Sequence, residues 1–327
     1  MPRSPGERAR RTRLKAIRRR LRFWWRRRAL AASPSIRVRL IDGWLDGPAA
    51  LAAMTPAASG RVGRVHFAFS HAEEPHYVLV LTHCRGQDSP RLQPPGRVWH
   101  AIGEPPLPVN ADMLTQAPPG ARVYAIGPSL PGPNPQTDYR AGHCLLRTWH
   151  VGKGYDELRA MALPADKPLG LSWITSARRW HPGHVRRMEF LARLQREVPF
   201  DLWGRGFRPI PDKWDGLAPY RYSIAFENSS YDDYFTEKIA DPILAGCLPL
   251  YVGCPNLERW LPPGCFVRID PDDPGVFDQI RSVVASDLWR ERRPALEEAK
   301  ALLLEKYNAF RFLAAEFEAD FPHTFGR

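Results

Sequence analysis

The sequence predicts an α/β protein built from two domains. Its 327 residues exceed the size at which a single hydrophobic core usually stops growing. Strand-like apolar segments recur in the first half of the chain, at residues 64–71, 76–83 and 97–105. In the second half, residues 220–253 are typical of a strand, a polar loop, a short helix and a second strand. Strands that alternate with helices in this way form parallel sheets covered by helices.

The chain is expected to divide into four segments. These are a basic tail at residues 1–33, an N-terminal α/β domain at 34–168, a second α/β domain at 169–285, and C-terminal helices at 286–327 that pack back on the body. Residues 153–168 mark the crossing between the domains. Residues 104–140 are rich in Pro and Gly, and we expect them to form loops at the domain interface.

The basic tail holds the whole excess of positive charge. The formal net charge is +12, and residues 1–28 contain twelve Arg and one Lys against one Glu. The other 299 residues balance, with 34 basic and 34 acidic side chains. A neutral body argues against a nucleic-acid-binding protein, so no nucleic acid partner is expected.

Residues 8–28 have the pattern of a basic amphipathic helix. Its apolar side chains recur at helical spacing: Leu14, Ile17, Leu21, Trp24 and Trp25. This pattern favours the surface of an anionic membrane, and therefore a cytoplasmic protein that is peripheral on the inner face of the cytoplasmic membrane. The apolar part is too short to cross a bilayer and lacks the core of a secretion signal. A disordered solubilising arm, an RNA-binding arm and a wrongly assigned start codon are the alternatives.

The strand that opens the run 220–253 ends in polar residues. Ile224 and Phe226 alternate with a small residue and predict a buried strand, which delivers Glu227 and Asn228 at its carboxyl end. The carboxyl ends of parallel strands are where α/β sheets bind ligands.

The helix that follows carries a lysine in its first turn. Thr236 suits the N-cap and Gly246 the terminating position, which places Lys238 at the helix N-terminus. Such an N-terminus is a natural site for a phosphate group. Pro242 conflicts with a regular helix, so either the helix is kinked or its regular part begins at Asp241.

This run resembles the signature of the α-1,3/1,4-fucosyltransferases, glycosyltransferase family 10, and particularly of their bacterial members. The matching motifs are Phe226-Glu227-Asn228-Ser229, Tyr234-Phe235-Thr236-Glu237-Lys238, and Ala245-Gly246-Cys247-Leu248-Pro249 with Gly253. A weaker resemblance spans residues 95–270.

The resemblance implies a GT-B fold, in which two Rossmann-like domains face each other across a cleft. It also implies the transfer of L-fucose from GDP-fucose to a glycan hydroxyl with inversion, and we expect a bacterial surface polysaccharide or lipopolysaccharide as acceptor. The N-terminal domain would meet the acceptor, and the domain at 169–285 would hold the nucleotide sugar. No cofactor is required. A divalent cation could pair with the diphosphate, but the sequence offers no metal-ligand cluster for one.

Site residues follow from the same resemblance. Lys238 and Arg187 match the groups that face the donor diphosphate, and Glu237 matches the carboxylate that holds the ribose hydroxyls. The remaining donor-binding candidates are polar residues of the same motif: Glu227, Asn228 and Tyr234.

Chemistry alone supports the same cations, because negative charge grows on the leaving β-phosphate and preorganised cations stabilise it. The alternative is that these residues only form part of a solvated helix surface and bind no ligand. Arg186 competes with Arg187, and the spacing to Leu194 favours Arg187.

Glu104 is the candidate general base. It stands in the run Ile-Gly-Glu-Pro-Pro, where the family carries a Gly-Glu-Asn-type motif, and Pro105 replaces the Asn. An inverting transfer needs one carboxylate near the acceptor hydroxyl. The alternative for Glu104 is a residue that shapes a turn before two prolines.

Other readings of the chain stay open. The same fold could use a different nucleotide sugar, or the chain could be a catalytically silent nucleotide- or glycan-binding module. The acidic run at residues 270–273 is expected to be a turn rather than a metal site, and Cys247 and Cys254 are expected to be reduced core residues.

Overall fold

The computed structural model describes residues 28–42, 47–81, 94–105, 117–126, 138–142 and 149–325. Residues 1–27 lie outside this part, so the amphipathic helix and its membrane contact stay predictions. Among the described residues, no helix combines the length and the apolar character that a membrane span requires.

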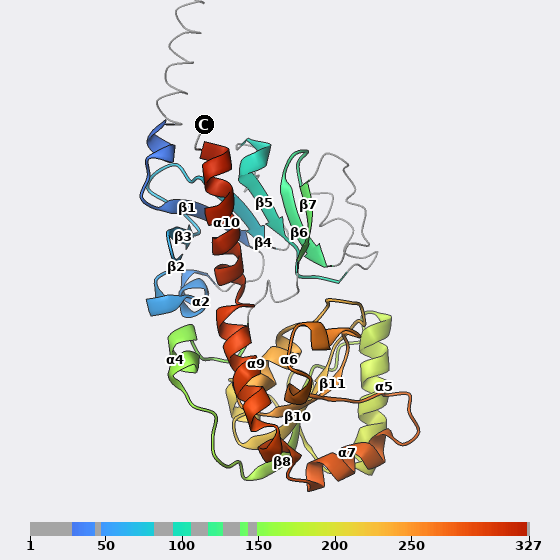
Figure 1. Ribbon diagram of the computed structural model, residues 1–327. Helices are drawn as coiled ribbons and strands as arrows, with labels where there is room; N and C mark the ends of the chain where they lie inside the picture. Colours follow the sequence, from blue (N-terminus) through green and yellow to red (C-terminus); the bar gives the residue numbers. More distant parts are fainter. Residues whose placement is uncertain are drawn as a thin grey trace, which may run out of the picture.

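The N-terminal domain is built on a seven-stranded sheet in the order β2-β3-β1-β4-β5-β6-β7 (Figure 1). Its strands are β1 (Ile36–Asp42), β2 (Arg61–Val62), β3 (Val65–Ala68), β4 (Tyr77–Leu81), β5 (Val98–Ala101), β6 (Arg122–Ile126) and β7 (Asp138–Gly142). All neighbours pair in parallel except β2 and β3. Every residue of β4 and β5 is buried, as expected of parallel strands covered on both faces. A short helix, α2 (Pro48–Ala53), follows β1.

The three predicted strands of this half are confirmed as β3, β4 and β5. The prediction that residues 104–140 form only loops is wrong, because β6 and the start of β7 lie in that segment. In β6 the last four residues, Val-Tyr-Ala-Ile, are buried. This apolar run is short and stands among Pro- and Gly-rich segments, which obscured its strand character.

The second domain contains a five-stranded parallel sheet in the order β12-β11-β10-β8-β9. Its strands are β8 (Leu169–Ile174), β9 (Asp201–Trp203), β10 (Tyr220–Phe226), β11 (Leu248–Val252) and β12 (Val267–Arg268). Three helices accompany them, namely α5 (Pro182–Glu197), α6 (Glu237–Leu244) and α7 (Val276–Ala285). The predicted strand–loop–helix–strand run is thereby confirmed as β10, α6 and β11.

The C-terminal segment returns to the N-terminal domain. After α8 (Leu288–Glu291), α9 (Arg293–Glu305) lies in the second domain beside α4 (Tyr155–Ala160), whereas α10 (Ala309–Phe325) lies against the first sheet (Figure 1). Phe317 of α10 stacks on Trp99 of β5 with ring centroids 4.1 Å apart. Burying each such phenylalanine contributes about 1.5–3 kcal/mol. The chain therefore crosses between the domains twice, through α4 and through the α9–α10 junction.

Two large, separate cores accompany the two sheets. One is formed by buried side chains between residues 149 and 307, and the other by residues 30–124 together with residues 310–325. Two sheets, one parallel and one parallel except for β2, each with its own core, confirm the predicted fold class, α/β and GT-B-like. Two smaller predictions are also confirmed: Cys247 and Cys254 are buried and free, and the amide of Asp272 donates to the Asp270 carboxylate in a turn.

Candidate functional site

A cavity of about 960 Å³ lies at the carboxyl ends of β8 and β10. The order of the second sheet reverses between these two strands, and such a switch point is where open α/β sheets bind ligands. The segment after β8, the segment after β10 and the first turns of α5 and α6 all contribute to its wall. From the first domain, residues 103–105 after β5 also line the cavity. The cavity therefore lies between the two domains.

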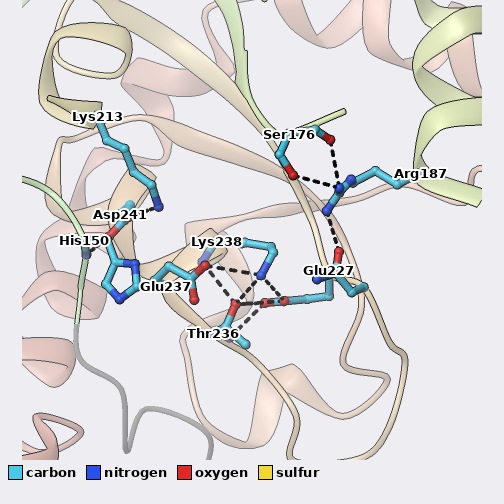
Figure 2. Close-up of polar contacts among 10 residues, drawn as sticks. His150, Ser176, Arg187, Lys213, Glu227, Thr236, Glu237, Lys238 and Asp241 are labelled. Atoms are coloured by element: carbon cyan, nitrogen blue, oxygen red, sulfur yellow. Dashed lines mark hydrogen bonds and ion pairs between the residues drawn. The ribbon is translucent and has the colours of Figure 1, made fainter. Parts of the chain in front are cut away.

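The first turn of α6 holds Lys238 in the cavity wall (Figure 2). Thr236 is the N-cap, as predicted, and its hydroxyl accepts from the Lys238 amide. The ammonium lies 3.3 Å from Glu237 Oε1 and 3.5 Å from Glu227 Oε2. Burial opposes the charge, but Glu237 and Glu227 outweigh it and raise the pKa of Lys238. Lys238 is thus a charged group fixed at a helix N-terminus.

Glu227 stands behind this wall rather than in it. Its Oε1 accepts from the Thr236 amide at 2.8 Å and from the Thr236 hydroxyl at 2.9 Å. The carboxylate is fully buried, and burial raises its pKa although Lys238 acts in the other direction. Glu227 was predicted to bind the donor; because its oxygens are bonded to the helix cap, the structure gives it the task of positioning α6.

Arg187 projects from α5 into the same cavity. It is 4% exposed, donates from Nη1 to Asn228 Oδ1, and donates from Nη2 to the Ser176 carbonyl at 3.0 Å. A Cβ at Gly183 would lie 1.7 Å from the carbonyl oxygen of Asn228, so only glycine lets α5 approach this closely. Burial, followed by the charge of Arg178, lowers the pKa of Arg187 to about 10.

Spacing predicted that Arg187 rather than Arg186 faces inward, and the structure confirms this. The Arg186 side chain is 46% exposed and pairs with Asp272 on the surface. The alternative that Arg187 is only a solvated helix residue is excluded by its burial.

The other predicted residues line the cavity as well. Asn228 and Glu237 stand at its wall beside the two cations. Tyr234 is 4% exposed and packs on Ile126 at the end of β6, so it joins the loop after β10 to the first domain. Glu104 lies in the wall that the first domain contributes, where its charge acts on His181.

An ion pair that the sequence did not reveal lies in the wall of the cavity. Lys213 Nζ lies 2.7 Å from Asp241 Oδ2, and Asp241 Oδ1 accepts from the His150 amide at 2.7 Å (Figure 2). Asp241 on α6 is thereby bonded to the segment that leads out of the first domain. The one signal in the sequence is an acidic residue inside an apolar helix.

Pro242 does not interrupt α6. The helix begins at Glu237, so the alternative that its regular part starts at Asp241 is wrong. With only eight residues, α6 loses a single intrahelical donor at Pro242, and the Pro242 carbonyl accepts from the Cys247 amide at 2.8 Å. Gly246 ends the helix with φ +75°, as its position predicted.

The cavity is electropositive. Five basic side chains line it, and they are Arg178, Arg187, Arg205, Lys213 and Lys238. Three carboxylates accompany them, and they are Glu104, Glu237 and Asp241. Such a lining favours an anionic ligand. Within the described part of the chain, no group of three or more His, Cys, Asp or Glu residues is placed to hold a metal ion.

Comparison with known proteins identifies the second domain. Residues 165–281 match the model of "Glycosyltransferase family 10 (fucosyltransferase) C-term". The chain is 34% identical over 119 residues to 4-galactosyl-N-acetylglucosaminide 3-alpha-L-fucosyltransferase FUT6 of Pongo pygmaeus, covering 33% of this chain and 32% of the relative. It is 31% identical over 160 residues to human Alpha-(1,3)-fucosyltransferase 4, covering 43% and 29%. The chain spans about a third of the length of the curated relatives that it matches.

Among solved structures, an alpha1,3-fucosyltransferase with GDP-fucose aligns at a TM-score of 0.49 and 15% identity, over 89% of this chain and 91% of its own. The family match covers β8 to most of α7 and includes Arg187, Asn228, Glu237 and Lys238. Over residues 165–281, which supply most of the cavity wall, the chain matches glycosyltransferase family 10, the fucosyltransferases.

Proposed function

We propose that this protein is a fucosyltransferase that moves L-fucose from GDP-fucose to a hydroxyl group of a glycan. The observation that carries the proposal is the pair of cations, Lys238 and Arg187, held in one cavity wall by different helices at the switch point of the sheet. The family match of the same domain supports it, as do the activities that the relatives' names give.

The two cations suit a leaving diphosphate. When the bond to the sugar breaks, negative charge develops on the β-phosphate, and donors already in place stabilise it without reorganisation. Lys238 is held by Thr236 and Glu237, and Arg187 by Ser176 and Asn228. Both groups are therefore preorganised before a ligand arrives.

The polar residues beside the cations suit the rest of the nucleotide. The Glu237 carboxylate is an acceptor for the two ribose hydroxyls, with Asn228 and Tyr234 completing the pocket. In the same proposal the ion pair between Lys213 and Asp241 anchors α6, so that Glu237 and Lys238 keep their positions.

Glu104 is the proposed general base. It comes from the first domain, whereas the diphosphate groups come from the second, and both line one cavity. A base that faces the leaving group across the cavity would remove the proton of an acceptor hydroxyl that attacks from the far side of the sugar, which inverts the anomeric centre. We further propose a bacterial surface glycan as acceptor, with residues 8–28 holding the enzyme at the inner face of the cytoplasmic membrane.

A panel of nucleotide sugars tests the proposal. Thermal melts and product release would be measured with GDP-fucose, GDP-mannose, UDP-glucose and UDP-N-acetylglucosamine. We expect GDP-fucose to raise the Tm most, and GDP to be released from it in the presence of glycan acceptors or, slowly, water. Stabilisation by a UDP-sugar alone would contradict the donor, and no stabilisation by any of them would contradict the site.

The variant Glu104→Gln separates binding from catalysis. It should keep the Tm shift with GDP-fucose and lose transfer by about 100-fold or more, the usual contribution of a general base. Full transfer activity in this variant would exclude Glu104 as the base. Binding without turnover in the wild-type protein, with a range of glycans, would favour a catalytically silent module.

A further inference from the structure

Asp233 has an unusual backbone conformation in the loop between β10 and α6. Its φ is +64°, in the left-handed region, and among the described non-glycine residues only Ala57 and Ala58 share a positive φ. Asp and Asn tolerate this region better than most side chains, but it is less favourable for them than for glycine. A residue stays in such a conformation when its surroundings hold it there.

Three hydrogen bonds hold Asp233. Its amide donates to Asn256 Oδ1 at 2.8 Å, and its Oδ1 accepts from Asn256 Nδ2 and from Trp260 Nε1, each at 2.9 Å. Asp233 follows β10, whereas Asn256 and Trp260 follow β11, the strand that pairs with β10 in parallel. The bonds therefore join two segments that leave neighbouring strands at the same edge of the sheet.

The same loop carries a contact between the two domains. Tyr234, the residue after Asp233, packs on Ile126 at the end of β6. Two residues further along, Thr236 caps α6, whose first turn holds Lys238. The conformation at Asp233 therefore directs the chain from a contact with the first domain to the helix that carries one of the two cations.

Aromatic packing extends from this loop to the other connection between the domains. Phe235 is buried against Trp260, with ring centroids 5.9 Å apart, and the Trp260 ring lies 5.8 Å from that of Tyr307. Tyr307 stands between α9 and α10, where the chain crosses back to the first domain. Because Trp260 also donates to Asp233, the carboxylate is bonded to a side chain that packs between the loop and this crossing.

We propose that Asp233 is a positioning residue for the transfer reaction, and that it sets where the cations of the second domain lie relative to Glu104 of the first. This inference rests on the proposed function of the same cavity. Lys238 and Arg187 have hydrogen-bond partners within the second domain, so the diphosphate site does not depend on Asp233. Glu104 reaches that site only through the way in which the domains meet, and Tyr234 is one point where they meet. A displacement of about 1 Å between reacting groups costs about 100-fold in rate.

Substitutions at position 233 separate the hydrogen bonds from the backbone conformation. Asp233→Asn keeps both, because the two side-chain bonds share Oδ1 and asparagine tolerates a positive φ. Asp233→Gly keeps only the conformation, and Asp233→Ala keeps neither. We expect kcat within about twofold of wild type for the Asn variant, about tenfold lower for Gly and about 100-fold lower for Ala.

GDP release from GDP-fucose by the full chain measures kcat, with water as the acceptor where no glycan is turned over. Calorimetry of the same variants with GDP gives the second quantity, and we expect the Kd to change by less than about threefold, because both cations keep their partners. The matched control is Asp232→Ala, an exposed neighbour in the same loop, which should leave kcat and Kd unchanged.

Hydrogen exchange reports on the domain contact without relying on turnover. In Asp233→Gly the amides of residues 124–126 should exchange faster than in the wild-type protein, because Tyr234 is no longer held against Ile126. In Asp233→Asn they should exchange at the wild-type rate. Unchanged exchange in Asp233→Gly would overturn the inference, whatever the value of kcat.

The kinetic results can overturn the inference in three further ways. A loss in Asp233→Asn as large as in Asp233→Ala would show that the charge matters rather than the bonds. Wild-type kcat in folded Asp233→Gly would show that the bonds do not matter, and a loss of GDP affinity in step with kcat would show that Asp233 only maintains the donor site. A wild-type protein that releases no GDP from GDP-fucose would overturn the proposed function and the inference together, whereas an active wild-type protein without the expected order overturns the inference alone.

Discussion

The two domains treat buried charge differently. In the first, two buried histidines are neutral: burial lowers the pKa of His100 in β5, and burial together with nearby arginines lowers that of His76, which precedes β4, each to about 4. In the second, Arg187 and Asp241 are buried as ions with partners, and Lys238 is held between Glu227 and Glu237.

This difference indicates which domain can bind a charged ligand. Desolvating a charge is costly, and a fold keeps such groups buried only where partners or a ligand compensate. The second domain concentrates these groups around one cavity. The first domain contributes residues 103–105 to that cavity, and its own sheet packs in an apolar core with α10. The domain that holds the charges is also the one that matches a family model.

The largest expected effect tests the neutral side of this comparison. His76 accepts from the Arg37 amide at Nδ1 and bonds to the Leu30 carbonyl through Nε2, so a second proton would break the first bond. Its folded-state pKa, about 4, is below the usual 6.5, so the unfolded chain binds more protons between these values. Stability is thus fully present above pH 6.5 and lost as the pH falls toward 4.

Urea titrations at pH 7 and pH 5 measure this loss. We expect His76 alone to cost about 2 kcal/mol between pH 7 and pH 5, with hydrogen exchange accelerating first in β1 and β4. The exposed His323 provides a control, because His323→Gln should leave the profile unchanged. Earlier opening of β10 and β11 at acid pH would contradict the comparison.

An effect of comparable size tests the charged side. In the proposed site, Lys238→Ala would remove one charge-assisted hydrogen bond to the diphosphate, worth about 1.5–3 kcal/mol, and should weaken GDP binding about 10- to 100-fold. Lys306→Ala, at an exposed position on the C-terminal side of α9, is the matched control and should bind normally. Equal GDP affinities in calorimetry, with both variants folded, would remove Lys238 from the site.

A smaller effect is expected for Arg187→Lys. The ammonium keeps the charge but cannot reach Asn228 and Ser176 together while it faces a phosphate, because it lacks the planar fork of arginine. We expect GDP affinity to fall about tenfold, in line with the loss of one charge-assisted hydrogen bond. Arg186→Lys should change it by less than about twofold, since exposed ion pairs contribute little. Full rescue by lysine at position 187 would show that charge alone suffices there.

The smallest effect concerns His100 in β5. Both of its ring nitrogens are buried without hydrogen-bond partners among the described residues. His100→Leu replaces the ring with an apolar side chain of similar size, and it should raise the free energy of unfolding by about 1 kcal/mol at pH 7. Destabilisation in a urea titration would show that the imidazole has a role that its surroundings do not reveal.

Local patterns predicted local structure well. The N-cap Thr236, the terminator Gly246 and the strands on either side of α6 follow from neighbouring residues, and all are confirmed. The inward orientation of the Arg187 side chain followed from helical spacing. The role of Glu227 did not, because a carboxylate at the end of a strand can face the cavity or the following helix cap, and only packing decides.

Long-range partners escaped prediction for a physical reason. Lys213, Asp241 and His150 meet through the tertiary fold, over separations of up to 91 residues. The buried Nδ1 of His184, which has no hydrogen-bond partner among the described residues, was not predicted either, because no local sequence pattern encodes such an absence. The strand β6 was missed because its flanks resemble loops.

Hydrogen exchange of the whole chain with and without GDP tests the central claim most directly. The account predicts that GDP protects the amides after β8, the first turn of α5, and the segment from Asn228 to the first turn of α6, while β1 to β4 exchange as before. Protection centred on β1 to β4, or no protection where GDP is bound by other measures, would contradict a nucleotide site in the charged cavity of the second domain.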